Sequence, residues 1–343
     1  MDTTKRLLII SLSISIVAII AILIFTIDDE TIKSLASIRP EFLIISMLVY
    51  LLSLLTWALR IKVISEGIGD HISLRECITI LMSSLFAAAI TPSKAGGEPV
   101  RIILMSRDRM SVGDATAVIL GERIFDALVL GLMAPFCVFI FKDLLADNEL
   151  LNYVFMGAML AFVVFFGIAG YVMLSVERIK KFLAFIGGIL SRFISEERSN
   201  HLISWATGEI DNFRDGLLKL VRESKGAVAI AILLTIATWI TYFMVASFIL
   251  IGLNLDPVWV QSIAAQALLN IVVMIPSTPG AVGVTEVTLA SLYSIMIDNI
   301  ALLGVFVLLW RFITYYINLI VGGIVSLKVL RDIDLGNISI GET

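Results

Sequence analysis

Long apolar runs separated by short polar linkers make up most of the chain. Six of these runs are long enough for membrane-spanning helices, since about 20 apolar residues cross ~30 Å of hydrocarbon. They cover residues 7–27, 42–61, 115–141, 151–174, 226–251 and 301–327. The first run follows two basic residues, as a signal peptide would, but it is too long for a signal core and should be retained. The pattern predicts an all-α polytopic membrane protein.

Two further stretches, 72–110 and 258–297, are apolar on both sides of a break rich in proline and glycine. The first break reads TPSKAGGE over residues 91–98, and the second reads PSTPGAVGVTE over residues 276–286. Backbone groups that a break frees at membrane depth are tolerated only where protein or a wet cavity satisfies them. We therefore expect each stretch to form a re-entrant helical hairpin, and the two breaks to line a cavity.

The same order of features occurs twice along the chain. A Thr-Trp pair precedes each broken stretch, and a glutamate closes each break. Glu98 is followed 25 residues later by Arg123, and Glu286 is followed 25 residues later by Arg311. Together with the opposite orientations that the charge distribution assigns, this pattern predicts an inverted repeat. Secondary transporters are built in this way, with sites near the membrane midplane.

The distribution of lysine and arginine predicts the orientation. Segment 175–225 has nine of these residues, whereas the linkers 28–41, 142–150 and 252–258 have two, one and none. Since cytoplasmic segments are enriched in them, we expect both termini in the cytoplasm and amphipathic helices on the inner surface of the cell membrane. The predicted single transmembrane domain comprises an N-terminal helix and linker (1–41), a first repeat (42–142), a connecting span (151–174), cytoplasmic helices (175–225), an inverted second repeat (226–327) and a cytoplasmic tail (328–343).

Composition narrows the range of functions. Of the residues, 59% are hydrophobic and only 16% are charged, too apolar a balance for a soluble domain. A formal net charge of −4 gives no basic footprint for nucleic acid. The two cysteines and two histidines suit neither a thiolate cluster nor a zinc site, and no phosphate loop or hydrolase motif is present. We expect no cofactor, no metal, no nucleic-acid partner and no enzymatic activity.

Ionisable side chains inside apolar runs are candidate functional groups, because burial there costs several kcal/mol unless a partner is present. Glu122, Arg123 and Asp126 share one face of the 115–141 run. They form either an interfacial ion pair that locks helix packing or a site that meets a substrate group or a proton. Glu98 is the nearest anion for Arg123.

Arg311 lies well inside the last apolar run, where Tyr315, Asn318 and Gly322 continue its face. Such a polar and small stripe is either helix-packing contact or the wall of a site. A lone arginine within it requires an anion, and Glu286 is the nearest candidate.

Polar groups also mark the two broken stretches. Lys94 and Arg101, with the backbone N–H groups of a broken helix, could bind a phosphate; the alternative is ordinary loop residues. Ser262, Gln266 and Asn270 share one face of the second stretch. They form either a solvated cavity wall or interhelical hydrogen bonds.

The two breaks and the ERIFD motif of residues 122–126 resemble the membrane domain of the lysylphosphatidylglycerol synthase/flippase family and its stand-alone relatives. The resemblance implies a lipid translocase domain without the soluble synthase domain. It maps the family motif onto Pro92, Gly96, Gly97, Glu98, Arg101, Glu122, Arg123, Asp126, Pro276, Pro279, Gly280, Gly283 and Glu286. Lys94 stands where arginine is expected in many relatives, and a lysine lacks bidentate geometry.

The sequence therefore predicts six spans and two re-entrant hairpins that translocate a lipid with an anionic or sugar-bearing headgroup, with membrane lipids as partners. The expected substrate-binding residues are Lys94, Gly96, Gly97, Glu98, Arg101, Glu122, Arg123, Asp126, Gly280, Gly283, Glu286 and Arg311. An ion-coupled carrier of a small anionic solute is the alternative. A membrane glycosyltransferase would need metal-holding carboxylates, for which Asp211 and Asp215 are the only close pair in the predicted cytoplasmic segment.

Overall fold

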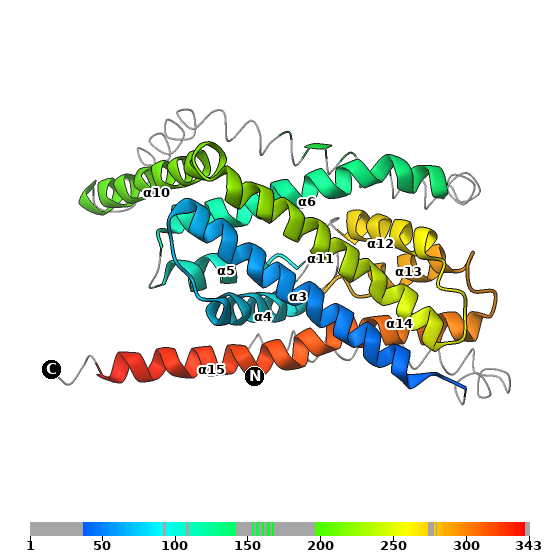
Figure 1. Cartoon of the computed structure of the whole chain (residues 1–343). Helices are drawn as coiled ribbons and strands as arrows, with labels where there is room; N and C mark the ends of the chain where they lie inside the picture. The colour runs from blue at the N-terminus through cyan, green and yellow to red at the C-terminus, as the bar shows by residue number, and fades with distance from the viewer. Residues whose placement is uncertain are drawn as a thin grey trace.

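A computed structural model describes residues 37–91, 94–107, 110–141, 196–273, 278 and 280–339, with isolated positions between 153 and 167. The predicted span 7–27, most of 151–174, the first part of 175–225, and Pro92, Pro276 and Pro279 lie outside the described residues. The helices are α3 (Pro40–Ile68), α4 (Leu74–Ile90), α5 (Gly97–Ser106), α6 (Val112–Ile140), α10 (Glu196–Arg222), α11 (Lys225–Gly252), α12 (Trp259–Val273), α13 (Val284–Tyr293), α14 (Ile300–Arg311), the π-helix η1 (Phe312–Tyr316) and α15 (Ile317–Ser339) (Figure 1).

Every regular element in the described part of the chain is a helix, which confirms that the fold is all-α. Pro40–Ile68, Lys225–Gly252 and Ile300–Val329 are long and apolar enough to cross a membrane. They match three of the predicted spans. The run expected at 115–141 is also helical, as α6.

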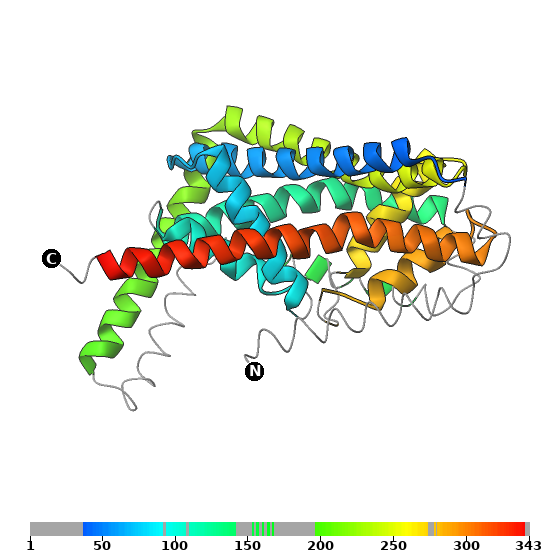
Figure 2. The ribbon, with the colours of Figure 1, turned by 90° about the horizontal axis from the view of Figure 1, so that it is seen from below.

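Helices α3 and α11 lie side by side and antiparallel along most of their length (Figures 1 and 2). At one end, the N–H of Arg39 donates to the carbonyl of Gly252 at 2.9 Å. At the other end, the hydroxyl of Ser224 donates to the carbonyl of Gly67 at 2.7 Å. This pair forms the long axis against which the other helices pack.

Both proline- and glycine-rich stretches fold as helix, break and helix. Helix α4 begins at a capping box in which Ser73 and Glu76 satisfy each other's backbone N–H groups, and it ends just before the break. Helix α5 then starts at Gly97 and packs against α4. In the second stretch, α12 and α13 pack against each other in the same way. The two helix-break-helix units predicted from the sequence are therefore present.

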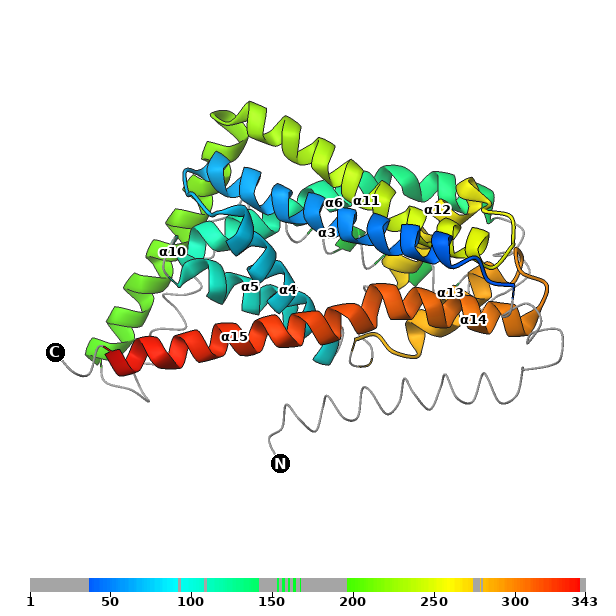
Figure 3. The ribbon, with the colours of Figure 1, turned by 60° about the horizontal axis from the view of Figure 1, so that its bottom comes forward.

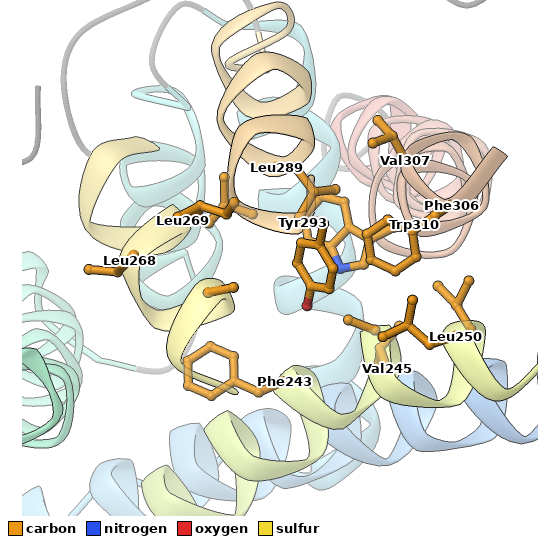
Figure 4. Packing of buried hydrophobic residues seen from close by; sticks show 14 of the residues in the cluster. Phe243, Val245, Leu250, Leu268, Leu269, Leu289, Tyr293, Phe306, Val307 and Trp310 are labelled. Atoms are coloured by element: carbon orange, nitrogen blue, oxygen red, sulfur yellow. The ribbon is translucent and has the colours of Figure 1, made fainter. Parts of the chain in front are cut away.

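The largest core lies among α11, α12, α13 and α14, whose apolar side chains converge in Figure 4. Tyr293 and Phe306 stack there with ring centroids 4.3 Å apart. A second core joins α3, α4 and α6 with the end of α10, where Leu217 and Leu220 are buried. The helix predicted within 175–225 is thus present over the described residues 196–222 and packs against α6.

Helix α15 packs against the second half of α4, which crosses it (Figure 3). Gly322 allows this approach, because a Cβ atom there would fall 2.6 Å from the carbonyl oxygen of Met82. The predicted stripe faces the interior, since Tyr315 and Asn318 are also buried. This packing brings η1, just beyond Arg311, next to the first break.

Candidate functional site

The two breaks meet. The N–H of Gly280 donates to the carbonyl of Thr91 at 3.1 Å, and the hydroxyl of Tyr315 donates to the carbonyl of Ala89 at 3.1 Å. Gly280 has a φ of +60°, and a Cβ atom there would fall 2.6 Å from the Tyr315 ring and 2.8 Å from the carbonyl oxygen of Ala89. Glycine is required at this position for both backbone angle and space.

Each break is flanked by an ion pair of the same geometry. Arg123 Nε lies 2.6 Å from Glu98 Oε1, and Arg311 Nε lies 2.7 Å from Glu286 Oε1. These are the two pairings that the 25-residue spacing indicated, and both are confirmed. They differ in burial: the Arg123 and Glu98 side chains are 30% and 49% exposed, whereas those of Arg311 and Glu286 are 5% and 12% exposed.

Lys94 lies at the junction of the two breaks, with a left-handed φ of +59°. It interacts electrostatically with Arg123, Arg311 and Glu286, so cations from both stretches gather in one region. Its side chain is exposed. An excess of positive charge beside a helix break is suited to an anion.

The glycines of the first break are packing residues. Gly96 donates its N–H to Thr91 Oγ1 at 2.9 Å, which closes the turn after α4. A Cβ atom at Gly97 would lie 3.1 Å from the carbonyl oxygen of Ser84. Both glycines hold α5 close to α4 and thereby set the positions of Lys94 and Glu98.

A buried charged network lies next to the first break, between α3, α5 and α6. Arg60 Nε lies 3.0 Å from Glu122 Oε1, and Arg60 Nη1 lies 2.6 Å from Asp126 Oδ1. Arg101 Nη2 pairs with Glu122 Oε2, and Arg123 Nη1 lies 3.2 Å from Asp126 Oδ2. Arg60, Arg101 and Glu122 are each at most 2% exposed.

Two tryptophans complete this network. Trp57 Nε1 donates to Glu122 Oε1 at 3.0 Å, and Trp239 Nε1 donates to Asp126 Oδ1 at 2.9 Å. All four carboxylate oxygens of Glu122 and Asp126 therefore accept hydrogen bonds, as buried charges require. This arrangement agrees with the interpretation in which the charges of the 115–141 run lock helix packing.

Arg60 was not predicted from the sequence. It lies near the end of an apolar run, where a basic residue looks like an interfacial anchor, yet it is 1% exposed. Charge balance was the available signal: Glu98, Glu122 and Asp126 carry three negative charges, whereas Arg101 and Arg123 supply two positive ones. The Trp57 position was a second signal, because it lies one helical turn before Arg60.

The surroundings of Arg311 carry fewer charges. Its guanidinium stacks on the Tyr315 ring with the Cζ atom 4.5 Å from the centroid. In the described part of the chain, its Nη2 and the neighbouring Trp310 Nε1 are buried without a hydrogen-bond partner. Glu286 uses its second oxygen, Oε2, to accept the N–H of Gly283 at 2.6 Å.

The polar face of α12 makes interhelical hydrogen bonds. Ser262 Oγ lies 2.6 Å from the Tyr293 hydroxyl, and Gln266 Nε2 donates to the same hydroxyl at 3.2 Å. Ser262, Gln266 and Tyr293 are fully buried. Of the two alternatives for this face, these contacts favour helix–helix contact over a solvated wall.

Comparison with known proteins gives one family. A family model described as "Lysylphosphatidylglycerol synthase TM region" matches residues 8–322. A UPF0104 membrane protein of Archaeoglobus fulgidus is 32% identical over 286 residues, covering 82% of this chain and 84% of the relative. A UPF0104 membrane protein of Methanocaldococcus jannaschii is 24% identical over 334 residues, covering 94% of this chain and 95% of the relative. This chain therefore belongs to the family of the lysylphosphatidylglycerol synthase transmembrane region.

Proposed function

We propose that this protein moves a lipid with an anionic or sugar-bearing headgroup between the two leaflets of the cell membrane. Its family is named for the membrane region of a synthase whose product is a lipid. The apolar helices supply the membrane setting. On this proposal the protein acts by transport and not by catalysis.

The observation that carries the proposal is the meeting of the two breaks. The hydrogen bond between Gly280 and Thr91 joins them, and one ion pair stands on each side, Glu98 with Arg123 and Glu286 with Arg311. Broken helices that face each other with ionisable groups are typical of transporter sites at the membrane midplane.

The topology that we propose has six full spans and two re-entrant hairpins, α4–α5 and α12–α13. The two halves form an inverted repeat, with both termini in the cytoplasm. The antiparallel pairing of α3 with α11 supports this arrangement. The identical Nε–Oε1 contacts of the two ion pairs support it too.

In this mechanism the headgroup occupies the junction of the breaks while the lipid chains stay in the bilayer. Lys94, Arg123 and Arg311 neutralise the anionic group. Glu98 and Glu286 hold the two arginines when the site is empty. Each arginine therefore has an anion nearby in both states, which avoids the cost of an unpaired arginine at depth.

The test is leaflet exchange in proteoliposomes, with tail-labelled lipids that carry zwitterionic, anionic and glycosylated headgroups. We expect headgroup-selective exchange by the natural protein and its loss in a double variant with Glu286→Gln and Arg311→Ala. Lys62→Met is the control, because Lys62 pairs with Glu66 on a partly exposed helix face. Unchanged exchange in the double variant would overturn the mechanism. No exchange of any lipid, with protection against heat by soluble anions, would favour a carrier of a small anionic solute.

A further inference from the structure

The N-terminus of α13 carries a backbone donor beside an open space. Gly283 has a φ of +86°, and among the described residues no atom beyond its chain neighbours lies within 4 Å of the position that its Cβ would take. Its N–H is held by Glu286 Oε2 at 2.6 Å. The first N–H groups of a helix carry partial positive charge and attract anions, so here the protein's own carboxylate fills the place of an anion.

Arg311 meets the same carboxylate from the opposite side. Its Nε lies 2.7 Å from Glu286 Oε1, and the residue is only 4% exposed. Arginine usually binds a carboxylate with two parallel hydrogen bonds. Here Nη2 is buried and has no partner among the described residues, which leaves one strong donor unused beside Glu286.

We propose that the Glu286 carboxylate is an internal stand-in for a phosphoryl oxyanion, which displaces it from the α13 N-terminus and Arg311. The lipid form of this ligand rests on the proposed function, whereas the oxyanion chemistry does not. A carboxylate has two oxygens, and both are already engaged. A phosphate offers more oxygens than a carboxylate does, so it can accept from Gly283, from Arg311 Nε and from Arg311 Nη2 together.

Lys94 gives a second reason why an oxyanion would replace the Glu286 carboxylate. It interacts electrostatically with both Arg311 and Glu286, so this junction has two cations and one internal anion. A phosphate monoester carries up to two negative charges and balances both cations, which a single carboxylate does not. The bound oxyanion therefore compensates both Lys94 and Arg311, whereas Glu286 alone leaves one of the two positive charges uncompensated.

The first break lacks this arrangement. Glu98 contacts Arg123 at 2.6 Å, but its side chain is 49% exposed, and Arg123 also keeps Asp126 as a partner at 3.2 Å. An anion that displaced Glu98 would find Arg123 still paired with Asp126, so it would gain less there than at Arg311. The comparison predicts that removal of charge at Glu286 affects anion binding far more than removal at Glu98.

The experiment is titration of the purified full chain in an uncharged detergent with inorganic phosphate, followed by calorimetry. Glu286→Gln removes the competing charge, so we expect it to raise phosphate affinity about tenfold or more, about 1.4 kcal/mol. We expect Glu98→Gln to raise it about twofold at most. Glu66→Gln is the control for charge removal on the exposed surface. Unchanged or weaker binding in Glu286→Gln would overturn the proposal.

A second readout does not depend on that variant. Phosphate should raise the melting temperature of the natural protein, and Arg311→Gln should abolish the rise while Arg123→Gln reduces it less. Equal losses in the two arginine variants would contradict the assignment to Arg311. Glu286→Ala, which also removes the stand-in, replaces Glu286→Gln if the latter does not fold.

A short-chain phosphatidic acid, titrated in parallel, distinguishes a lipid headgroup from free phosphate. If it binds at least as tightly as phosphate and Glu286→Gln strengthens both, the site takes the oxyanion of a lipid. If only inorganic phosphate binds, the oxyanion site is supported, and the inference that its ligand is a lipid headgroup is wrong. Lipid exchange without any effect of Glu286→Gln on phosphate binding would leave the proposed function standing and overturn this inference.

Discussion

Arg123 and Arg311 stand beside matching glutamates at the two helix breaks, yet their surroundings differ. Arg123 contacts two carboxylates, those of Glu98 and Asp126. Arg311 pairs only with Glu286 among the described acidic residues, and its guanidinium stacks on the Tyr315 ring. The same kind of ion pair therefore occurs twice. At the first break it lies among charged side chains, and at the second break it lies beside aromatic rings.

The residues next to the two pairs make the same contrast. Glu122 precedes Arg123 and joins the charged network, whereas Trp310 precedes Arg311 and packs edge-on against Tyr242, with centroids 6.3 Å apart. Trp310 lies within the apolar core of α11 to α14 (Figure 4).

The contrast separates two roles. In the network around α3 and α6, each buried carboxylate oxygen has a partner, so removal of one member leaves an uncompensated charge. At the second break, one carboxylate links a backbone donor and one arginine, and its replacement by another anion leaves the backbone donor and the arginine paired. We propose that the first region holds the fold and that the second exchanges ligands.

The largest expected effect is on stability, from Arg60→Met. This change leaves Glu122 and Asp126 without their main cation and should lower the free energy of unfolding by about 3–5 kcal/mol. Thermal unfolding in detergent measures it. Lys62→Met, whose exposed partner is Glu66, should change stability by less than about 1 kcal/mol. A similar loss in both variants would mean that the buried network does not hold the fold.

A pair of glycine variants compares two positions within the second break. Gly280→Ala places a methyl group 2.8 Å from the carbonyl oxygen of Ala89, and Gly283→Ala meets no atom within 4 Å. Both alanines would adopt a positive φ, which costs about 1 kcal/mol. Gly280→Ala should therefore destabilise more, by about 2–3 kcal/mol once the breaks are forced apart. Unfolding of both variants under the same conditions tests this, and equal losses would contradict the described contact.

The smallest expected effect concerns the contact between α3 and α11. Thr238 Oγ1 donates to Thr56 Oγ1 at 2.9 Å, so Thr238→Val removes one interhelical hydrogen bond while it keeps the shape. Such bonds contribute about 0.6 kcal/mol in membrane proteins. A loss above about 2 kcal/mol in thermal unfolding would show that this contact rivals the charged network.

Local pattern accounts for what the sequence could predict. The hydropathy predicted α11 to within one residue of its bounds and α3 with an end seven residues short, and the proline- and glycine-rich breaks predicted a helix on each side of each break. The equal spacing of the glutamates and arginines predicted both ion pairs. Helical periodicity placed the Arg311 stripe in the interior. Each of these inferences depends on a short stretch or on a regular repeat.

Long-range packing explains what the sequence did not predict. The contacts of Arg60 with Glu122 and Asp126 bridge 62 and 66 residues, and nothing local distinguishes a buried arginine from an interfacial one. The role of Ser262 and Gln266 depended on where Tyr293 lies. The π-helix at Phe312–Tyr316, and with it the stacking of Tyr315 on Arg311, has no signal in the hydropathy pattern.

The most direct test of the account is the rate of leaflet exchange of one tail-labelled phosphatidic acid, measured for the natural protein, Glu286→Gln and Glu66→Gln. Phosphate affinity and melting temperature are measured on the same preparations. The account predicts exchange by the natural protein and by Glu66→Gln, and a loss of about tenfold or more in Glu286→Gln because its anion is held too tightly to leave. Exchange that is the same in all three proteins, or absent from the natural protein, would contradict it.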